Sequence, residues 1–258
     1  MSNTPNKRIT DDFIRKRIGE KYTNYQNCEV VIVDYINCEN CSVLFDNKFL
    51  VTNLQYGHIK RGRVKNPYWP SVFGVGYIGQ GEHELSVDKK HTKVYNTWNS
   101  FLERSYDEKY HMKYPTYKDV ISCEEWHNFQ NFAKWFEENY NPETMEGWQL
   151  DKDILIKGNK IYSPETCCFV PQEINSLFSR KQNSLVTGVN KVRNKYRAKI
   201  QKNGKLKCLG YFDTIEEAFQ AYKTAKEEWI RQVADKWKGK ISDRVYEAMY
   251  NYKVEITD

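Results

Sequence analysis

The segment from Arg180 to Lys207 carries ten Lys and Arg residues and no Asp or Glu. A solvated face normally mixes both signs of charge, so an acid-free stretch of this length constrains the chain strongly. Within it, Lys195–Ile200 and Lys205–Gly210 alternate basic with apolar residues on either side of Asn203-Gly204. Period-two alternation across an Asn-Gly pair predicts a β-hairpin.

Side chains alternate along a strand, so the basic residues of the first strand should share one face of the hairpin. We expect that face to carry Arg193, Lys195, Arg197 and Lys199. A β-ribbon with a cationic face fits a DNA groove, and neutralisation of phosphates supplies affinity that does not depend on sequence. The alternative is a solvated hairpin, and the missing acids favour nucleic-acid binding over it.

A helix is predicted directly after the hairpin. Thr214 and Glu217 have the spacing of a capping box. Apolar residues then recur at helical intervals, which predicts one apolar face that packs on the back of the sheet: Ala218, Phe219, Tyr222, Ala225, Trp229 and Ile230. The expected unit is three strands backed by one helix.

This pattern resembles the ethylene-response-factor (Apetala-two type) DNA-binding domain, over roughly Leu185 to Arg231. The matching residues are Gly188-Val189, Arg193, Tyr196-Arg197-Ala198, Ile200, Asn203-Gly204-Lys205, Leu209-Gly210, Phe212-Asp213-Thr214, Glu216-Glu217-Ala218 and Ala221-Tyr222. Tyr196 stands where the family usually has Trp, and we expect it to face the core. The resemblance implies a sheet laid in the major groove of double-stranded DNA, with candidate contacts at Arg193, Lys195, Arg197, Lys199, Lys205 and Lys207.

Length and composition predict a chain of two or three small domains with real cores. The 258 residues are 40% apolar and include seven Trp, 19 Tyr and 12 Phe. No stretch approaches the roughly 20 apolar residues of a membrane span, and the first residues lack the apolar segment of a signal peptide. We therefore expect a cytoplasmic protein with no membrane partner.

The seven cysteines are read as reduced and mostly buried. Cys38 and Cys41 have a two-residue gap, but a zinc site usually needs two such pairs, and only Cys28 offers a third ligand. Cys41 is expected in a strand as a small hydrophobic residue. Zinc bound by Cys38 and Cys41 is the alternative.

The N-terminal third reads as a small β-meander that ends near Ile59. Its strands are predicted at Val30–Ile36, Cys41–Phe45 and Phe49–Val51, with a turn at Asp46–Lys48 between the last two. Lys60–Lys65 follows as a basic loop, which is either an extra phosphate contact or simply solvated. Residues 66–91 are rich in Gly, Pro and aromatic residues and predict a connector that packs on a neighbour.

Helical periodicity begins near Thr92, with Trp98 in its apolar stripe. Ser122 and Glu125 again have capping-box spacing and predict a second helix whose buried stripe contains Trp126, Phe129, Phe132-Ala133 and Phe136. Further on, Trp148–Ile154, a loop at Lys157–Lys160, Ile161–Pro171 and Gln172–Phe178 predict strand, loop, strand and short helix. Asp151 ends the first strand, and Asn175 lies on the helix that packs beside it.

This order resembles the HNH nuclease motif, especially as found in phage-encoded homing endonucleases. Trp98, Cys123–Trp126, Phe129 and Phe132 are similar to the lead-in of those proteins, and the resemblance covers roughly Lys93 to Arg231. An HNH core followed by an ethylene-response-factor domain also occurs among them. If the chain is phage-encoded, the expected location is the host-cell cytoplasm.

The resemblance implies a divalent ion, Mg²⁺ or Mn²⁺, held by Asp151 and Asn175. Lys152 stands in the general-base position, where the family has His, and Thr166 stands where a middle Asn is often found. A Lys with an ordinary pKa of about 10.4 is a poor base at neutral pH. His127 and His111 are alternative bases.

The sequence therefore predicts an α+β, multidomain fold: a small N-terminal β domain with its connector at 1–91, a helical and HNH-like ββα-metal domain at 92–180, and a three-stranded sheet packed on a helix at 181–258. The first hypothesis is a DNA-binding, homing-endonuclease-like protein that cleaves phosphodiesters with a metal ion. The second is a DNA-binding protein or regulator that does not cleave. A protein-interaction module is a third class, supported only by the aromatic N-terminal third.

Overall fold

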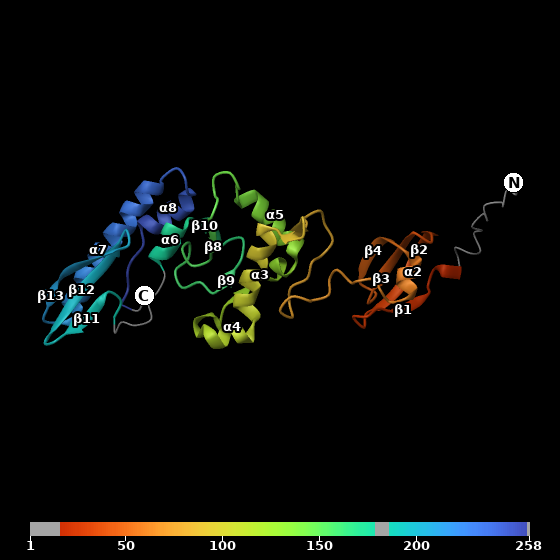
Figure 1. The fold of residues 1–258 in the computed structure, drawn as a ribbon, viewed down its shortest axis with the longest axis horizontal. Coiled ribbons are helices and arrows are strands. Elements are labelled where there is room, and N and C mark those ends of the chain that lie inside the picture. Colours follow the sequence, from red (N-terminus) through yellow and green to blue (C-terminus); the bar gives the residue numbers. More distant parts are fainter. Residues whose placement is uncertain (1–15, 179–185, 257–258) are drawn as a thin grey trace. The chain divides into compact units, whose positions relative to one another are not determined.

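The computed structural model describes residues 16–178 and 186–256, and its fold is α+β with several small sheets (Figure 1). The contacts divide the chain into two units, residues 1–90 with 124–132, and residues 91–123 with 133–258. Across the described ranges, no helix combines the length and apolarity needed to cross a membrane.

The first unit is built on a four-stranded antiparallel meander, which confirms the predicted β-meander. Its strands pair in chain order, and the helix α2 (Tyr56–Lys60) follows them. The strands are β1 (Lys21–Thr23), β2 (Glu29–Asn37), β3 (Asn40–Phe45) and β4 (Phe49–Leu54). The predicted turn at Asp46–Lys48 is present, because Asp46 and Asn47 both have positive φ.

Alternate residues of these strands form the core of the first unit, and Cys41 is among them, fully buried in β3. Cys38 is exposed. The described residues contain no group of three or more His, Cys, Asp or Glu side chains placed to hold a metal ion. Cys41 therefore behaves as the small hydrophobic residue that its strand position predicted.

The Gly- and aromatic-rich connector packs on residues 124–132 of the same unit, as expected. The Tyr77 backbone N–H donates to the His127 carbonyl at 2.9 Å, and the Phe129 N–H donates to the Tyr77 carbonyl at 2.9 Å. Gly79 and Gly81 lie directly against the side chains of Asn128 and Gln130, which would have to shift to admit a Cβ at either glycine. Two short strands end this stretch, β5 (Ser86–Val87) and β6 (Lys90–His91).

Thr92 caps the first long helix through a hydrogen bond from the Tyr95 N–H, and Trp98 is fully buried as predicted. Ser122, in contrast, does not cap a helix. It lies in β7, and Asn128 accepts a hydrogen bond from the Gln130 N–H instead. The elements are α3 (Lys93–Tyr106), α4 (Glu108–Lys113), η1 (Pro115–Tyr117), β7 (Ile121–Ser122), η2 (Glu124–His127) and α5 (Phe129–Asn139).

The expected order of strand, loop, strand and short helix is present in the second unit. The elements are β8 (Gln149–Asp151), β9 (Ile161–Tyr162), β10 (Cys168–Val170) and α6 (Gln172–Leu177). β8 pairs antiparallel with β10, and β9 pairs parallel with β7. Phe169 of β10 packs against Trp135, Phe136 and Tyr140, so α5 closes the apolar side of this small sheet.

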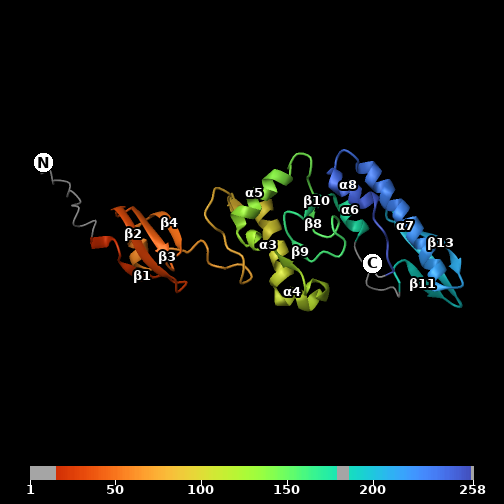
Figure 2. The same cartoon turned by 180° about the vertical axis from the view of Figure 1, so that it is seen from behind.

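The C-terminal part of the second unit is a three-stranded antiparallel sheet covered on one face by a long helix (Figures 1 and 2). The elements are β11 (Val189–Val192), β12 (Lys195–Lys202), β13 (Lys205–Phe212), α7 (Ile215–Trp237) and α8 (Asp243–Tyr250). The capping box of Thr214 and Glu217 is complete. Asn203 and Gly204 both have positive φ, which confirms the predicted Asn-Gly hairpin turn.

We predict that Gly188→Ala destabilises the fold far more than Gly204→Ala. Both glycines have positive φ, so both substitutions carry backbone strain of about 1 kcal/mol. A Cβ at Gly188 would also overlap the buried ring of Tyr222, whereas a Cβ at Gly204 has no atom within 4 Å. Overpacking should cost Gly188→Ala a further ~1–3 kcal/mol of unfolding free energy, measured by denaturant titration. Equal destabilisation of the two variants would contradict this packing.

Candidate functional site

The cations of β12 lie on the face of the sheet that α7 does not cover. Ala198 and Ile200 are buried on the α7 side. Lys195, Arg197 and Lys199 alternate with them along the strand and therefore point the other way. The expectation was wrong for Arg193, which occupies the turn between β11 and β12 with φ of 56° and continues no strand face.

Lys205 and Lys207 belong to the opposite face. They pair directly with Lys202 and Ile200 across the hairpin, and residues directly opposite in a ladder share a face. The two-residue turn at Asn203-Gly204 sets this pairing, and the bulge between Ala198 and Lys199 shifts the register only farther along, from Gly210 to Phe212. The candidate DNA contacts thus form two groups, and only the β12 group stands on the open face.

Two buried polar atoms on the open face have no hydrogen-bond partner among the described residues. They are Nε of Arg197 and Oδ1 of Asn190, which faces Arg197 across the strand pair. A buried polar atom without a partner costs about 1–3 kcal/mol, so a ligand that satisfied it would gain that energy. On β13, the strand on the other side of β12 from Asn190, Tyr211 pairs with Arg197 and is 55% exposed.

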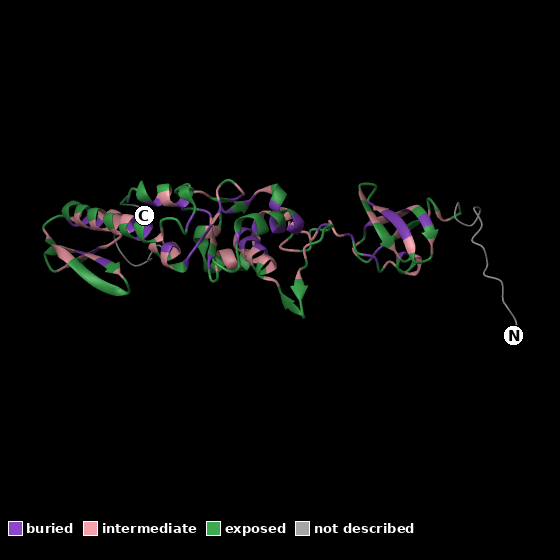
Figure 3. Cartoon of the chain, turned by 90° about the horizontal axis from the view of Figure 1, so that it is seen from above, coloured by how far each residue is buried: buried purple, intermediate pink, exposed green. Residues whose placement is uncertain are grey.

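Acidic side chains neutralise little of the positive charge on the open face. Lys195 forms an ion pair of 3.0 Å with Asp213, but both side chains are more than half exposed, so the pair is weak. β13 is exposed along most of its length (Figure 3). Arg180 and Lys181, the first two cations of the basic segment, lie outside the described residues.

Asp151 is held in place by its own turn. Its Oδ1 accepts hydrogen bonds from the backbone N–H groups of Asp153 at 2.7 Å and Ile154 at 2.8 Å. Burial raises the pKa of the Asp151 carboxyl despite these two bonds. A half-buried carboxylate beside backbone donors is the kind of group from which a cation site can be built.

Asn175 reaches the same strand from α6. Its Nδ2 donates to Oε1 of Gln149 at 2.5 Å. Gln149 and Asp151 are two residues apart on β8, so their side chains leave the same face of the strand. Asp151 therefore lies on the face of β8 that Asn175 approaches, and the two predicted ligand positions are on neighbouring elements.

The side chain of Lys152 contacts neither Asp151 nor Asn175 in the hydrogen bonds that its amino group makes. Its side chain is buried, with only 6% of the residue exposed, and its Nζ donates to Oδ1 of Asp153 and to the carbonyl of Asn159 at 3.0 Å. The amino group at the predicted general-base position thus has a structural role, tying the turn after β8 to the loop before β9.

The remaining sequence-predicted groups also serve the local structure. Thr166 donates from Oγ1 to the Ile161 carbonyl at 2.7 Å, and so braces the loop before β10. Nε2 of His111 contacts the Arg104 carbonyl at 2.8 Å. His127 belongs to the first unit, where burial lowers the pKa of its imidazole. None of these contacts brings an imidazole to Asp151.

The oxygen atoms that β8 and α6 could offer a cation are those of the Asp151 carboxylate and of the Gln149 and Asn175 amides. In this structure Oε1 of Gln149 accepts from Nδ2 of Asn175, and Oδ1 of Asp151 accepts from backbone N–H groups. Mg²⁺ prefers oxygen ligands, keeps several waters, and is commonly bound by only one or two carboxylates together with phosphate oxygens. One carboxylate makes this a weak site without a phosphate ligand.

A polar cleft of about 550 Å³ opens beside Asn175, and the sequence analysis did not identify it. Its walls come from one side of α3 and from β8 and α6. The lining residues are His91, Lys93, Asn96, Thr97, Ser100, Phe101, Arg104, Trp148, Gln149, Leu150 and Asn175. The signal was present in the sequence, because Lys93, Asn96, Thr97, Ser100 and Arg104 recur at helical spacing on the face opposite the apolar stripe.

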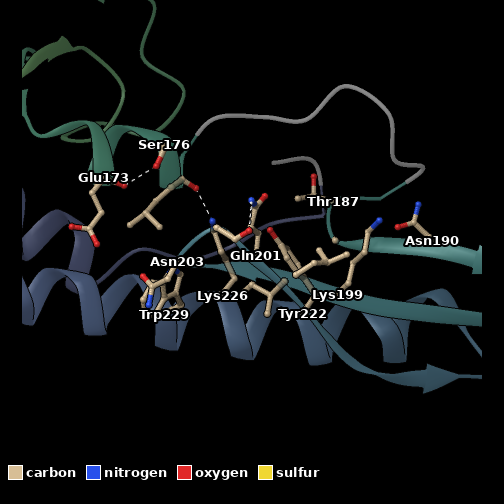
Figure 4. A pocket seen from close by; sticks show the side chains of 15 residues that line it. Glu173, Ser176, Thr187, Asn190, Lys199, Gln201, Asn203, Tyr222, Lys226 and Trp229 are labelled. Atoms are coloured by element: carbon tan, nitrogen blue, oxygen red, sulfur yellow. Dashed lines mark hydrogen bonds between the residues drawn. The ribbon is translucent and has the colours of Figure 1, made fainter.

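The short helix α6 is fastened to α7 by half-buried and exposed polar contacts. The Glu173 carboxylate accepts from Nζ of Lys236 at 2.7 Å and from Nε1 of Trp237 at 2.8 Å. Nζ of Lys226 donates to the Leu177 carbonyl at 2.7 Å (Figure 4). A cavity of about 710 Å³ lies beside this contact, with Tyr222 and Trp229 of α7 in its wall. The strand-loop-helix element and the basic sheet thus belong to one packed unit.

No protein-family model matches the chain, and no curated protein or solved structure matches it significantly. The residues and their geometry therefore carry the functional argument alone.

We predict that Asp151→Asn keeps or raises the unfolding free energy at neutral pH, whereas Asp151→Ala lowers it. The Asn side chain can still accept from the Asp153 and Ile154 N–H groups, and the substitution removes a half-buried charge. Ala leaves both donors without their acceptor, at about 1–3 kcal/mol. Denaturant titrations of both variants provide the measurement.

The pH dependence gives a second readout for Asp151. Its carboxyl pKa is raised in the folded state, so the folded state binds the proton more tightly. Wild-type stability should therefore fall, relative to Asp151→Asn, as the pH rises from the ordinary Asp pKa through the raised one. A difference of the opposite sign would show that the carboxylate is stabilised in its ionised form.

Proposed function

We propose that the protein binds double-stranded DNA through the open face of the β11–β12–β13 sheet. The observation that carries this proposal is the placement of Lys195, Arg197 and Lys199 on the face that α7 leaves free, within a segment without a single acid. A three-stranded sheet of this size fits the major groove, and cations along one strand follow the phosphate backbone.

Arg197 is the residue best suited to the centre of such an interface. Its guanidinium is half-buried, its Nε has no partner among the described residues, and the exposed ring of Tyr211 stands across the strand pair from it. A planar guanidinium binds a phosphate, or the O6 and N7 atoms of a guanine, with two hydrogen bonds. Desolvated on one side by the sheet, Arg197 is pre-organised for that contact.

Removing two charges from the open face should weaken DNA binding and flatten its salt dependence. For Arg197→Ala with Lys199→Ala, we expect the slope of log affinity against log salt to fall by about 0.9 for each phosphate that the protein no longer neutralises. Fluorescence anisotropy with the full chain and a duplex at several salt concentrations measures this slope.

The matched control is Lys109→Ala with Lys134→Ala, which removes two exposed charges from α4 and α5. The control should retain the wild-type slope. If both double variants weaken binding equally, binding reflects net charge alone and the sheet is not the interface. If the wild-type protein does not bind duplex at low salt, the proposed function is wrong.

The second candidate function is metal-dependent phosphodiester cleavage by the β8–β10–α6 element. It is favoured by the approach of Asn175 to the face of β8 that carries Asp151. Asp151 would supply the anionic oxygen and Asn175 a neutral one. A bound Mg²⁺ or Mn²⁺ would polarise the phosphoryl oxygen and stabilise the leaving group. Binding without cleavage is the alternative, and the structural role of Lys152 favours it.

If the protein cleaves DNA, Asp151→Asn should abolish cleavage and leave binding unchanged. Lys152→His should not raise the rate, because position 152 is enclosed between Asp153, Asn159 and the Tyr162 ring. Nicking of a supercoiled plasmid with and without Mg²⁺ or Mn²⁺ is the measurement. A faster Lys152→His variant would show that this side chain reaches the reacting water. The absence of metal-dependent nicks in wild type would leave the binding function alone.

A further inference from the structure

The cleft beside α3 has a lining that contains no acidic side chain among the described residues. Its charged and titratable members are Lys93, Arg104 and His91, and the other polar members are amides and hydroxyls. Such a lining offers hydrogen-bond donors and positive charge, and no carboxylate in it balances that charge. The chemistry of the cleft therefore fits an anion.

Arg104 is the strongest anion-binding group in the cleft. It is half-buried, and its Nη1 lies 3.4 Å from the Tyr162 hydroxyl. The groups that act on its charge are the tyrosines 162, 117 and 110, and within the described ranges it has no carboxylate partner. Burial acts against its charge, but these tyrosines hold the pKa of Arg104 above its ordinary value. A partly desolvated guanidinium without a counter-ion binds an oxyanion strongly.

The polar side of α3 extends this cationic wall along the cleft. Asn96 and Thr97 lie about two turns before Arg104, on the same side of the helix. Gln149 and Asn175 form the facing wall. The cleft thus presents donors on both sides of a groove rather than a single point of charge, which suits an elongated anion better than a small spherical one.

We propose that this cleft binds a backbone phosphodiester of DNA, with Arg104 as the anion-binding residue and Asn96 at its rim. The proposal rests on the DNA-binding function of the sheet and adds a second contact in the same packed unit. The contacts between α6 and α7 hold the cleft and the sheet in one arrangement, so the two contacts fall at a fixed separation along the duplex.

Phosphate ethylation interference on a bound duplex tests the second contact directly. Wild type should show two blocks of phosphates whose ethylation weakens binding, and Arg104→Gln should lack only one of them. The affinity of Arg104→Gln should fall about tenfold to a hundredfold. Lys109→Gln, an equal charge change on the exposed side of α4, should keep both blocks.

A second variant, Asn96→Asp, tests the same cleft in case Arg104→Gln does not fold. Position 96 is exposed near the start of α3, where a carboxylate is favourable for the helix, so the variant should fold normally. Its new negative charge should nevertheless remove the same block of phosphates. If both variants keep both blocks, the cleft does not contact DNA, whereas the sheet remains the interface.

A short probe separates failure of the cleft from failure of the sheet. The thymidine dinucleotide with a 5′-phosphate is too short to span the sheet, and we expect it to shift the amide NMR signals of α3 at millimolar concentration. The shift should be absent in Arg104→Gln. If neither duplex nor dinucleotide binds, both proposals are wrong. If duplex binds while the dinucleotide leaves the α3 signals unchanged, the cleft proposal alone is overturned.

Discussion

The packing of β12 against α7 decides what the C-terminal sheet can do. Ala198 and Ile200 are buried beneath the helix, so the residues that alternate with them must point away from it. Those residues are Lys195, Arg197 and Lys199, and their charges could not be desolvated beneath α7 without a large penalty. The burial of the apolar residues of β12 therefore determines which way the alternating basic residues point, and so places the positive charge on the open face.

The attachment of α6 to α7 has a similar role for the second unit as a whole. Glu173 lies on a helix of only six residues, and its carboxylate is bonded to both Lys236 and Trp237. The polar side chains of α3, the Asn175 amide and the basic sheet are thereby parts of one body. In the proposed binding mode, a duplex on the sheet would meet the cleft at a set distance, and any cleavage at β8 would then occur at a fixed position relative to the sheet.

Much of the fold could be predicted from short-range patterns. The N-terminal meander, the Asn-Gly hairpin and the Thr214 capping box each depend on residues close in sequence, and each is present. Ser122 shows the limit, because its capping-box spacing was overridden when β7 paired with β9, about forty residues away. The β13 bulge is a second limit, because it shifts the pairing of Tyr211 and Phe212, whereas the faces of Lys205 and Lys207 follow from the two-residue Asn203-Gly204 turn.

The candidate site was predictable only in its linear order. Asp151 and Asn175 were identified by their place in the strand-loop-helix pattern, but the partners of Lys152 depend on a loop that folds back from Asn159. Arg104 was overlooked because its helix was read by its apolar stripe, whereas its environment of tyrosines is set by tertiary packing. Motif spacing thus locates elements, and burial determines the role of each side chain.

The central claim is that DNA lies on the sheet face that α7 leaves open. Lysine acetylation of the full chain, with and without duplex and read residue by residue by mass spectrometry, tests it most directly because both faces carry lysines. We expect duplex to protect Lys195 and Lys199 more strongly than Lys205 and Lys207. Stronger protection of Lys205 and Lys207, or no protection of either pair, would contradict it.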